Sequence, residues 1–216
     1  MSVDLEFPNP WITETIEDVI AVGGRLTVSN LARAYEMGIF PWPHPGYPLL
    51  WFCPEQRGII EFSEIHVGRS LQKWIRQNQD LIEVKMNCRF SEVVKACRLQ
   101  KRKGQKGSWI NDEIEKSYSQ LHQKGMAFSL ECYKDGLMIS GIYGVQSKNY
   151  ISCESMFHKI DNASKYAFIK LVERFKMMGH TWMDLQMISE VSGYLGGKYI
   201  SRDQFLKKIK LKKTLT

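Results

Sequence analysis

YISCESMF, at residues 150–157, is an apolar, strand-like run that carries an acid, Glu154, where a core residue would be expected. An ionised carboxylate among apolar neighbours is costly unless a partner stabilises it. A second run, TWMDLQM at residues 181–187, places Asp184 and Gln186 on one strand face and apolar side chains on the other, because side chains alternate along a strand. The two runs predict a sheet whose polar groups form a site. The alternative is a solvated sheet face.

The neighbouring segments predict the rest of this sheet. Two strand-like runs, at 126–133 and 137–145, flank an Asp-Gly pair that is typical of a β-hairpin turn, and residues 150–157 would add an antiparallel third strand. An amphipathic helix that begins at Asp161 or Asn162 separates this third strand from the TWMDLQM run. A strand, a helix and a strand in this order indicate a crossover, which lays the last strand parallel to a neighbour.

The first 62 residues have a different character from the rest of the chain. They are rich in turn formers and aromatics, with one helix expected at 29–37, where Thr27 or Ser29 caps it and Gly38 ends it. Longer helices follow at 70–78, 90–99 and 111–124. We therefore predict an α/β (α+β) fold with a small domain at 1–62 and a larger domain, with a mixed and mainly antiparallel sheet, at 63–216.

Composition narrows the class of protein. The chain has 216 residues, of which 44% are hydrophobic, and its 30 basic against 23 acidic residues give a net charge of +7 that favours an anionic partner such as nucleic acid. No apolar run reaches transmembrane length and no leader-like segment opens the chain, so we expect a cytoplasmic protein, monomeric by default, without membrane contact. The five cysteines form no Cys-x-x-Cys pair, so we expect no disulfide framework, metal or cofactor.

Three tryptophans, Trp42, Trp51 and Trp109, lie in loop or strand-edge contexts, where a ring can stack on a nucleobase for about 1–3 kcal/mol. Ordinary core filling is the alternative for each. Trp109 is the best candidate because it follows a basic segment without an acidic residue, an arrangement typical of nucleic-acid contact. The candidate phosphate contacts in that segment are Arg98, Lys101, Arg102, Lys103 and Lys106.

Several short motifs occur in order along nearly the whole chain. They are Phe7-Pro8-Asn9-Pro10, Ala21-Val22-Gly23-Gly24-Arg25-Leu26, Gly38-Ile39-Phe40-Pro41-Trp42, Ser108-Trp109-Ile110, Tyr143-Gly144-Val145, Glu154-Ser155-Met156-Phe157, Asn162-Ala163-Ser164-Lys165 and Asp184-Leu185-Gln186. Together they closely resemble the leucyl/phenylalanyl-tRNA–protein transferase family. The recurrence of several patterns in the right order is more specific than any one of them.

The resemblance implies a small N-terminal domain and an acetyltransferase-like C-terminal domain that binds the aminoacyl end of tRNA in place of acetyl-CoA. It implies an aminoacyltransferase that moves Leu, Phe or Met from charged tRNA to the N-terminal α-amine of acceptor proteins. Acceptors would begin with Arg or Lys and would be marked for degradation. No cofactor or covalent enzyme intermediate is expected.

The resemblance also assigns roles to residues. Trp42, Trp109 and Tyr118 would bind the terminal adenosine, and Glu154 would engage the substrate. Asp184 and Gln186 would carry the reaction, with Gln186 orienting the amine and passing on polarisation from the Asp184 carboxylate. The donor side-chain pocket would comprise Ile142, Ile151, Cys153, Met156, Phe175 and Met183. Such an apolar, flexible pocket suits Leu, Phe or Met.

Two departures from the family pattern leave alternatives open. Cys153 stands where the family commonly has Gly, and Ser189-Glu190-Val191 stands where it usually has Asn-Asp-His. A change of acceptor to a small molecule or peptide is therefore a second hypothesis. A third is a tRNA-binding protein without catalysis, against which the retention of Glu154, Asp184 and Gln186 argues.

Overall fold

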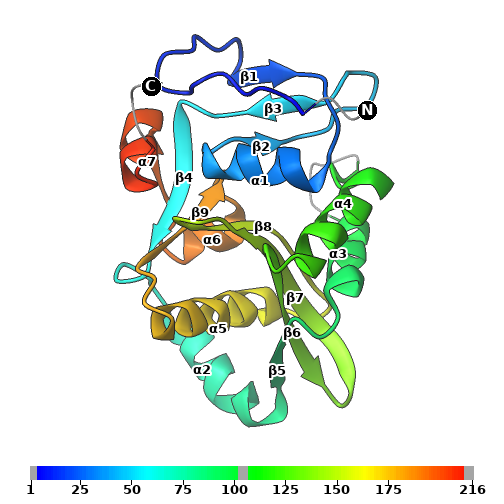
Figure 1. The fold of residues 1–216 in the computed structure, drawn as a ribbon. Coiled ribbons are helices and arrows are strands. Elements are labelled where there is room, and N and C mark those ends of the chain that lie inside the picture. The colour runs from blue at the N-terminus through cyan, green and yellow to red at the C-terminus, as the bar shows by residue number, and fades with distance from the viewer. Residues whose placement is uncertain (1–3, 102–106, 212–216) are drawn as a thin grey trace.

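The computed structural model describes residues 4–101 and 107–211, which fold around two sheets (Figure 1). Within these residues the larger sheet has seven strands in the order β10-β4-β9-β8-β7-β6-β5, and the smaller has the order β1-β3-β2. The larger sheet contains β4 (Gln56–Glu61), β5 (Glu83–Met86), β6 (Ala127–Lys134), β7 (Leu137–Gln146), β8 (Ile151–His158), β9 (Trp182–Gln186) and β10 (Lys198–Ser201). The smaller sheet contains β1 (Val19–Val22), β2 (Phe40–Pro41) and β3 (Leu50–Phe52).

Helices cover both faces of the larger sheet. They are α1 (Val28–Glu36), α2 (Arg69–Asn78), the 3-10 helix η1 (Gln79–Leu81), α3 (Phe90–Leu99), α4 (Asp112–Gln123), α5 (Ala163–Met177), α6 (Glu190–Tyr194) and α7 (Arg202–Lys208). Helix α5 packs on one face, whereas α3 and α4 pack on the other, toward the smaller sheet and α1 (Figure 1).

The predicted fold class, with a mixed and mainly antiparallel sheet, is confirmed. Strands β6 and β7 form the expected hairpin, and β8 pairs antiparallel with β7. Strand β9 returns after α5 and pairs parallel with β8, with Ser152 opposite Asp184. The crossover therefore brings the YISCESMF and TWMDLQM runs side by side.

Strand β4 falls inside the range assigned to the small N-terminal domain but pairs with β9 and β10 of the larger sheet. The pairing places Gln56–Glu61 with the larger sheet, although the expected boundary lay at residue 62. Sequence patterning alone does not reveal this, because a strand with four consecutive buried residues lacks the alternation that marks one sheet face.

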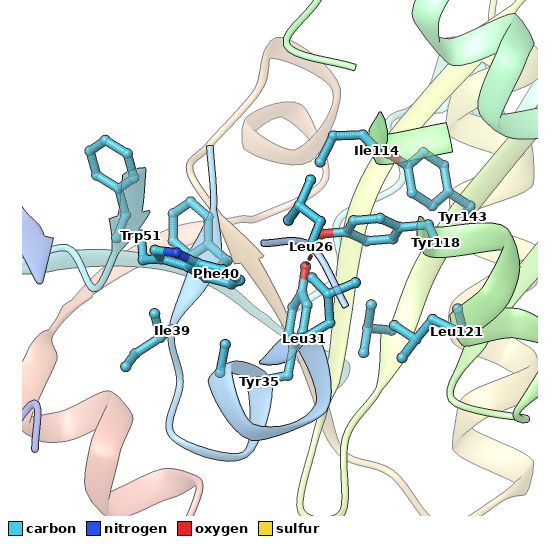
Figure 2. Packing of buried hydrophobic residues seen from close by; sticks show 14 of the residues in the cluster. Leu26, Leu31, Tyr35, Ile39, Phe40, Trp51, Ile114, Tyr118, Leu121 and Tyr143 are labelled. Atoms are coloured by element: carbon cyan, nitrogen blue, oxygen red, sulfur yellow. Dashed lines mark hydrogen bonds between the residues drawn. The ribbon is translucent and has the colours of Figure 1, made fainter. Parts of the chain in front are cut away.

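The N-terminal part and the rest of the chain share one apolar core on the α3–α4 face of the larger sheet. Figure 2 shows Tyr35 of α1 and Tyr118 of α4 pointing toward one another, with their hydroxyls joined at 2.6 Å. The Tyr150 hydroxyl also donates to the Tyr35 carbonyl oxygen at 2.8 Å. A second apolar core lies on the opposite face, under α5. Buried polar links as well as apolar packing therefore connect α1 to the larger sheet.

Local signals predicted the capping hydrogen bonds of α1 and α4 correctly but not that of α5. Thr27 caps α1, because its side chain accepts the Asn30 backbone N–H, and Asn111 caps α4 by accepting from Ile114. Helix α3 begins and ends at the expected residues, Phe90 and Leu99. The expected cap of α5 is Asp161 or Asn162. Asn162 occupies the cap position, but its side chain makes no capping hydrogen bond. Capping chemistry is local, and so the sequence alone predicts it well.

A β-bulge interrupts the pairing of β7 with β8 at the position of the predicted acid. Tyr143 pairs with Ser155 and the next residue, Gly144, pairs with Cys153, so Glu154 is the extra residue. A Cβ atom added to Gly144 would lie 2.2 Å from the carbonyl oxygen of Ser152. Only a glycine at this position allows β7 to approach the bulged strand so closely.

We therefore expect Gly144→Ala to lower the free energy of unfolding by about 3 kcal/mol, the upper end of the usual cost of overpacking a core. Urea denaturation would measure the change. The matched control is Gly193→Ala on α6, where the added Cβ would meet only a flexible Ile188 methyl at 3.2 Å. Equal stability of the two variants would show that β7 can yield at the bulge.

Candidate active site

A cavity of about 490 Å³ opens between the smaller sheet, the middle of β8 and the C-terminal end of β9. Two tryptophans, Trp42 after β2 and Trp109 before α4, line it together with Glu154 of β8 and Gln186 of β9. Its other lining residues are Phe40, Pro41, Cys153, Ser155, Met156, Leu185, Met187, Ile188, Ser189, Ser192 and Tyr199. Aromatic rings and a carboxyl–amide pair therefore face the same space.

The carboxyl–amide pair is held by direct hydrogen bonds. The Gln186 Nε2 atom donates to Glu154 Oε2 at 2.8 Å and to the Ser152 hydroxyl at 3.3 Å. The other carboxyl oxygen of Glu154, Oε1, is shielded from solvent and has no hydrogen-bond partner in the described part of the chain. A buried acceptor without a partner is costly, which favours the neutral form of this carboxyl group.

Burial raises the pKa of Glu154 from 4.5 to about 7, because the surrounding protein disfavours the charged form. The hydrogen bond from Gln186 and the nearby hydroxyls of Tyr35 and Ser152 oppose this shift, and the negative charge of Asp184 adds to it. A carboxyl group with such a pKa exchanges its proton near neutral pH. This property suits a general acid or base.

Asp184 is fully buried beneath the cavity and does not line it. Its Oδ1 accepts from Arg57 Nε at 2.8 Å, and its Oδ2 accepts from Arg57 Nη2 at 2.7 Å. The Ser152 hydroxyl donates to Oδ2 at 3.1 Å and thereby lies between Asp184 and the Gln186 amide. A chain of hydrogen bonds therefore runs from Arg57 through Asp184, Ser152 and Gln186 to Glu154.

Gln186 has an unusual backbone. Its φ of 60° lies in the left-handed region, which costs a residue other than glycine about 1–3 kcal/mol. The Gln186 backbone N–H donates to Asp184 Oδ1 at 3.0 Å, so the same carboxylate that binds Arg57 also holds this turn. Strain of this kind persists only where the surrounding structure enforces it.

Comparison with known proteins gives a consistent result. A model of the leucyl/phenylalanyl-tRNA protein transferase family matches residues 59–210, and the model of its N-terminal domain matches residues 24–55. The chain belongs to the leucyl/phenylalanyl-tRNA–protein transferase family. This membership confirms the resemblance and the expected enzyme class, an aminoacyltransferase.

Curated members of the transferase family match almost end to end. The protein from Flavobacterium psychrophilum is 38% identical over 210 residues, which cover 97% of this chain and 98% of that protein. The one from Sulfurimonas denitrificans is 39% identical over 207 residues, covering 95% and 88%. Both are named leucyl/phenylalanyl-tRNA–protein transferase.

Distant similarities to solved structures are also found. L-PGS from Bacillus licheniformis is 14% identical, with a TM-score of 0.45, and the match covers 75% of this chain and 53% of that one. The aminoglycoside N-acetyltransferase AAC(6')-Iy in complex with CoA is 14% identical, with a TM-score of 0.35 and coverage of 62% and 90%.

The expected transferase residues divide between the cavity and the core. Trp42, Trp109, Glu154 and Gln186 line the cavity, as do two residues of the expected donor pocket, Cys153 and Met156. The remaining residues of that pocket are fully or almost fully buried in the core under α5 and do not reach the cavity surface. They are Ile142, Ile151, Phe175 and Met183. They lie behind Cys153 and Met156, which line the cavity and contact the same core.

Tyr118 also lies behind the cavity. Its side chain is fully buried, its hydroxyl is bonded to that of Tyr35, and it does not line the cavity that holds the two tryptophans. The structure therefore presents no Tyr118 surface for stacking on an adenosine. Trp51, the third candidate aromatic, fills the core, where its Nε1 donates to the Gly23 carbonyl oxygen at 2.9 Å.

The basic segment is only partly described. Arg98 forms ion pairs with Asp112 and with Glu115 of α4, the latter at 3.6 Å, so carboxylates already engage its charge. Lys101 is exposed. The remaining expected phosphate contacts, Arg102, Lys103 and Lys106, lie outside the described residues.

Residues 4–101 and 107–211 contain neither a cluster of candidate metal ligands nor a candidate membrane-spanning helix. No group of three or more His, Cys, Asp or Glu side chains there could hold a metal ion. None of the helices in these ranges has the length and apolar character that crossing a bilayer requires.

Burial raises the pKa of the Cys153 thiol well above its ordinary value, so this cavity residue stays neutral and is a poor nucleophile.

Sequence reasoning missed Arg57 and Ser152. A usable signal existed for Arg57, because it stands directly before the apolar Gly58-Ile59-Ile60 run, and a buried arginine needs an acid or a carbonyl partner. Ser152 gave no signal of its own. Its role follows only from its place opposite Asp184 in the parallel pair of strands.

Proposed function

We propose that this enzyme transfers an apolar amino acid, Leu, Phe or Met, from aminoacyl-tRNA to the N-terminal α-amine of acceptor proteins that begin with Arg or Lys. The observation that carries the proposal is the Glu154–Gln186 pair facing a cavity that two tryptophans line. The transfer would mark acceptors for degradation in the cytoplasm. It would need no cofactor, and the enzyme would act as a monomer.

The two rings suit the terminal adenosine of the donor. Trp42, after β2, and Trp109, before α4, are far apart in the sequence but line the same cavity, where each can stack on the base. The net charge of +7 supports binding of the tRNA backbone. Cys153 and Met156 give the same cavity an apolar, adaptable wall for the donor side chain.

Glu154 is the group best placed to manage the acceptor's proton. An α-ammonium has a pKa of about 7.7–8.0, close to the value of about 7 to which burial raises the pKa of Glu154. Glu154 therefore accepts a proton from the ammonium, and the neutral nitrogen attacks the ester carbonyl carbon. The new C–N bond forms and the C–O bond to the ribose breaks. A second proton passes from the nitrogen to the leaving ribose oxygen, and Glu154 releases the first proton to solvent.

Gln186 positions the reactants and does not act as a base. Its amide nitrogen already donates to Glu154 and Ser152, which leaves the amide carbonyl oxygen to accept from the incoming amine. An ester is already activated, and orientation of two reactants can supply effective molarities on the order of 10⁵ M or more. Positioning therefore supplies most of the rate in this mechanism.

The test uses purified protein, tRNA charged with labelled Leu, Phe or Met, and peptides that differ only in their first residue. We expect label in peptides that begin with Arg or Lys and none in matched peptides that begin with Ala or Asp. Transfer only to a small molecule would favour the second hypothesis. Binding of charged tRNA without product under any acceptor would identify a non-catalytic binder.

Trp109→Ala is expected to raise KM for aminoacyl-tRNA by about 5- to 150-fold, the equivalent of about 1–3 kcal/mol of base stacking. Steady-state kinetics with varied donor would measure it. The matched control is Trp74→Ala, because Trp74 packs on Tyr166 of α5, away from the cavity. If both variants raised KM equally, general destabilisation rather than stacking would explain the effect.

A further inference from the structure

We infer that Arg57 is a positioning residue for aminoacyl transfer: through Asp184 it fixes the left-handed turn at Gln186 and thereby aims the Gln186 amide at Glu154. The inference rests on the proposed function and deepens it. It assigns a role to a side chain that never touches the cavity, and it changes the expected role of Asp184 from a reacting group to a structural support of the reacting pair.

Hydrogen bonds and aromatic contacts hold the Arg57 guanidinium in place. Besides its two hydrogen bonds to Asp184, its Nη1 donates to the Gly38 carbonyl oxygen at 3.1 Å. The guanidinium lies over the rings of Phe40, at 4.7 Å, and Phe205, at 4.3 Å. A fully buried guanidinium held by a carboxylate, a carbonyl and two rings cannot change its direction, so its position defines that of the Asp184 carboxylate.

The Asp184 carboxylate has no acceptor capacity left for a substrate. Its two oxygens accept four hydrogen bonds, two from Arg57, one from the Ser152 hydroxyl and one from the Gln186 backbone N–H. A carboxylate offers about four lone-pair sites, so these donors fill it. Asp184 therefore does not take a proton from the amine. Its contribution is to hold Ser152 and the Gln186 backbone in place.

The Gln186 turn depends on this support. The hydrogen bond from the Gln186 backbone N–H to Asp184 stabilises its left-handed φ of 60°. In the same turn the Met187 backbone nitrogen donates to the Leu185 carbonyl oxygen, with 2.6 Å between nitrogen and oxygen. Gly58, which follows Arg57 and pairs with Gln186, leaves room for the turn, because an added Cβ would lie 3.0 Å from the Met187 carbonyl carbon. Residues 57 and 58 thus shape the turn together.

A double-mutant cycle between Arg57 and Gln186 tests the inference. Arg57→Lys keeps the charge but loses the two-pronged contact, and we expect kcat to fall on the order of 10²-fold, as for a small misplacement of a reacting group, with KM for aminoacyl-tRNA unchanged. If Arg57 acts through Gln186, adding Arg57→Lys to Gln186→Ala causes no further loss of kcat. Losses that multiply would overturn the inference.

The matched control is Arg202→Lys. Arg202 is also largely buried, donates to Thr15 at 2.9 Å and pairs with Asp18 at 3.5 Å, but it does not line the cavity. We expect this change to leave kcat unaltered in both the parent and the Gln186→Ala background. A fall in kcat equal to that of Arg57→Lys would show a general response to arginine loss and would overturn the inference.

A second variant keeps the test decisive if Arg57→Lys does not fold. Arg57→Met combined with Asp184→Leu replaces the ion pair with apolar side chains, an exchange that is often neutral or stabilising. We expect this double variant to fold and to have the low kcat of Gln186→Ala. We also expect the backbone amide hydrogen of Gln186 to exchange with solvent faster than in the parent. Parental kcat in the folded double variant would overturn the inference. Failure of the proposed function looks different, because then the parent itself transfers nothing.

Discussion

Glu154→Gln is expected to lower kcat for aminoacyl transfer by about 10²- to 10⁴-fold, the usual contribution of a positioned acid or base, with little change in KM for the donor. The amide keeps the size of the side chain and its hydrogen bonding to Gln186, but it cannot carry the proton of the acceptor amine. Single-turnover measurements with pre-bound aminoacyl-tRNA would isolate this chemical step from product release.

The pH dependence sharpens this test. Burial raises the pKa of Glu154 to about 7, so the parent's kcat should rise as pH increases through 7 and the carboxyl group loses its proton. Glu154→Gln should lack that rise. Glu131→Gln is the matched control, because Glu131 is a fully buried carboxyl group that binds Ser129 and the start of α3, away from the cavity. A rise that survived in Glu154→Gln would assign the proton to another group.

The same shift has a consequence for stability. Because the folded-state pKa of Glu154 is raised, ionisation is harder in the folded protein, and the free energy of unfolding falls as pH increases from about 4.5 to about 7. At about 1.4 kcal/mol per pKa unit, Glu154→Gln removes a loss of about 3 kcal/mol at pH 8. Urea denaturation of both proteins at pH 4 and pH 8 would reveal this difference. Equal pH dependence would contradict it.

Asp184→Ala is expected to lower the free energy of unfolding by about 3–5 kcal/mol, because it leaves the Arg57 guanidinium buried without its carboxylate. Chemical denaturation monitored by tryptophan fluorescence would measure the change. Asp112→Ala is the control, since the Asp112 side chain is 92% exposed. Its ion pair with Arg98 is a surface pair, which solvent screens, so its removal should change stability far less. Similar losses in the two variants would mean that water reaches Arg57.

The sequence predicted those features that depend on neighbouring residues. As alternation in the TWMDLQM run predicts, Met183 packs in the apolar core under α5, whereas Asp184 binds Arg57 outside that core. The hairpin and crossover followed from turn chemistry and element order. Glu154 and Gln186, which come from the two runs that the sequence singled out, are joined by a 2.8 Å hydrogen bond. Period, capping and turn signals act over a few residues, and so a single sequence carries them in full.

Features that depend on distant pairing could not be predicted. Arg57 lies 127 residues from Asp184 along the chain, and neither residue identifies the other without the register of β4 against β9. The bulge at Glu154 changes which side chains face the cavity. Alternation alone therefore could not separate Cys153 and Met156, which line the cavity, from buried Ile151 behind it.

The membership of β4 in the larger sheet limits how the chain can be divided. A fragment that starts after residue 62 would lose this strand, so β9 and β10 would expose unpaired edges, a known route to aggregation. The same truncation would remove Arg57, which leaves Asp184 without its ion-pair partner, and would remove Trp42 from the cavity. The C-terminal segment is therefore not a portable catalytic module, and engineering by domain exchange must carry residues 56–61 with it.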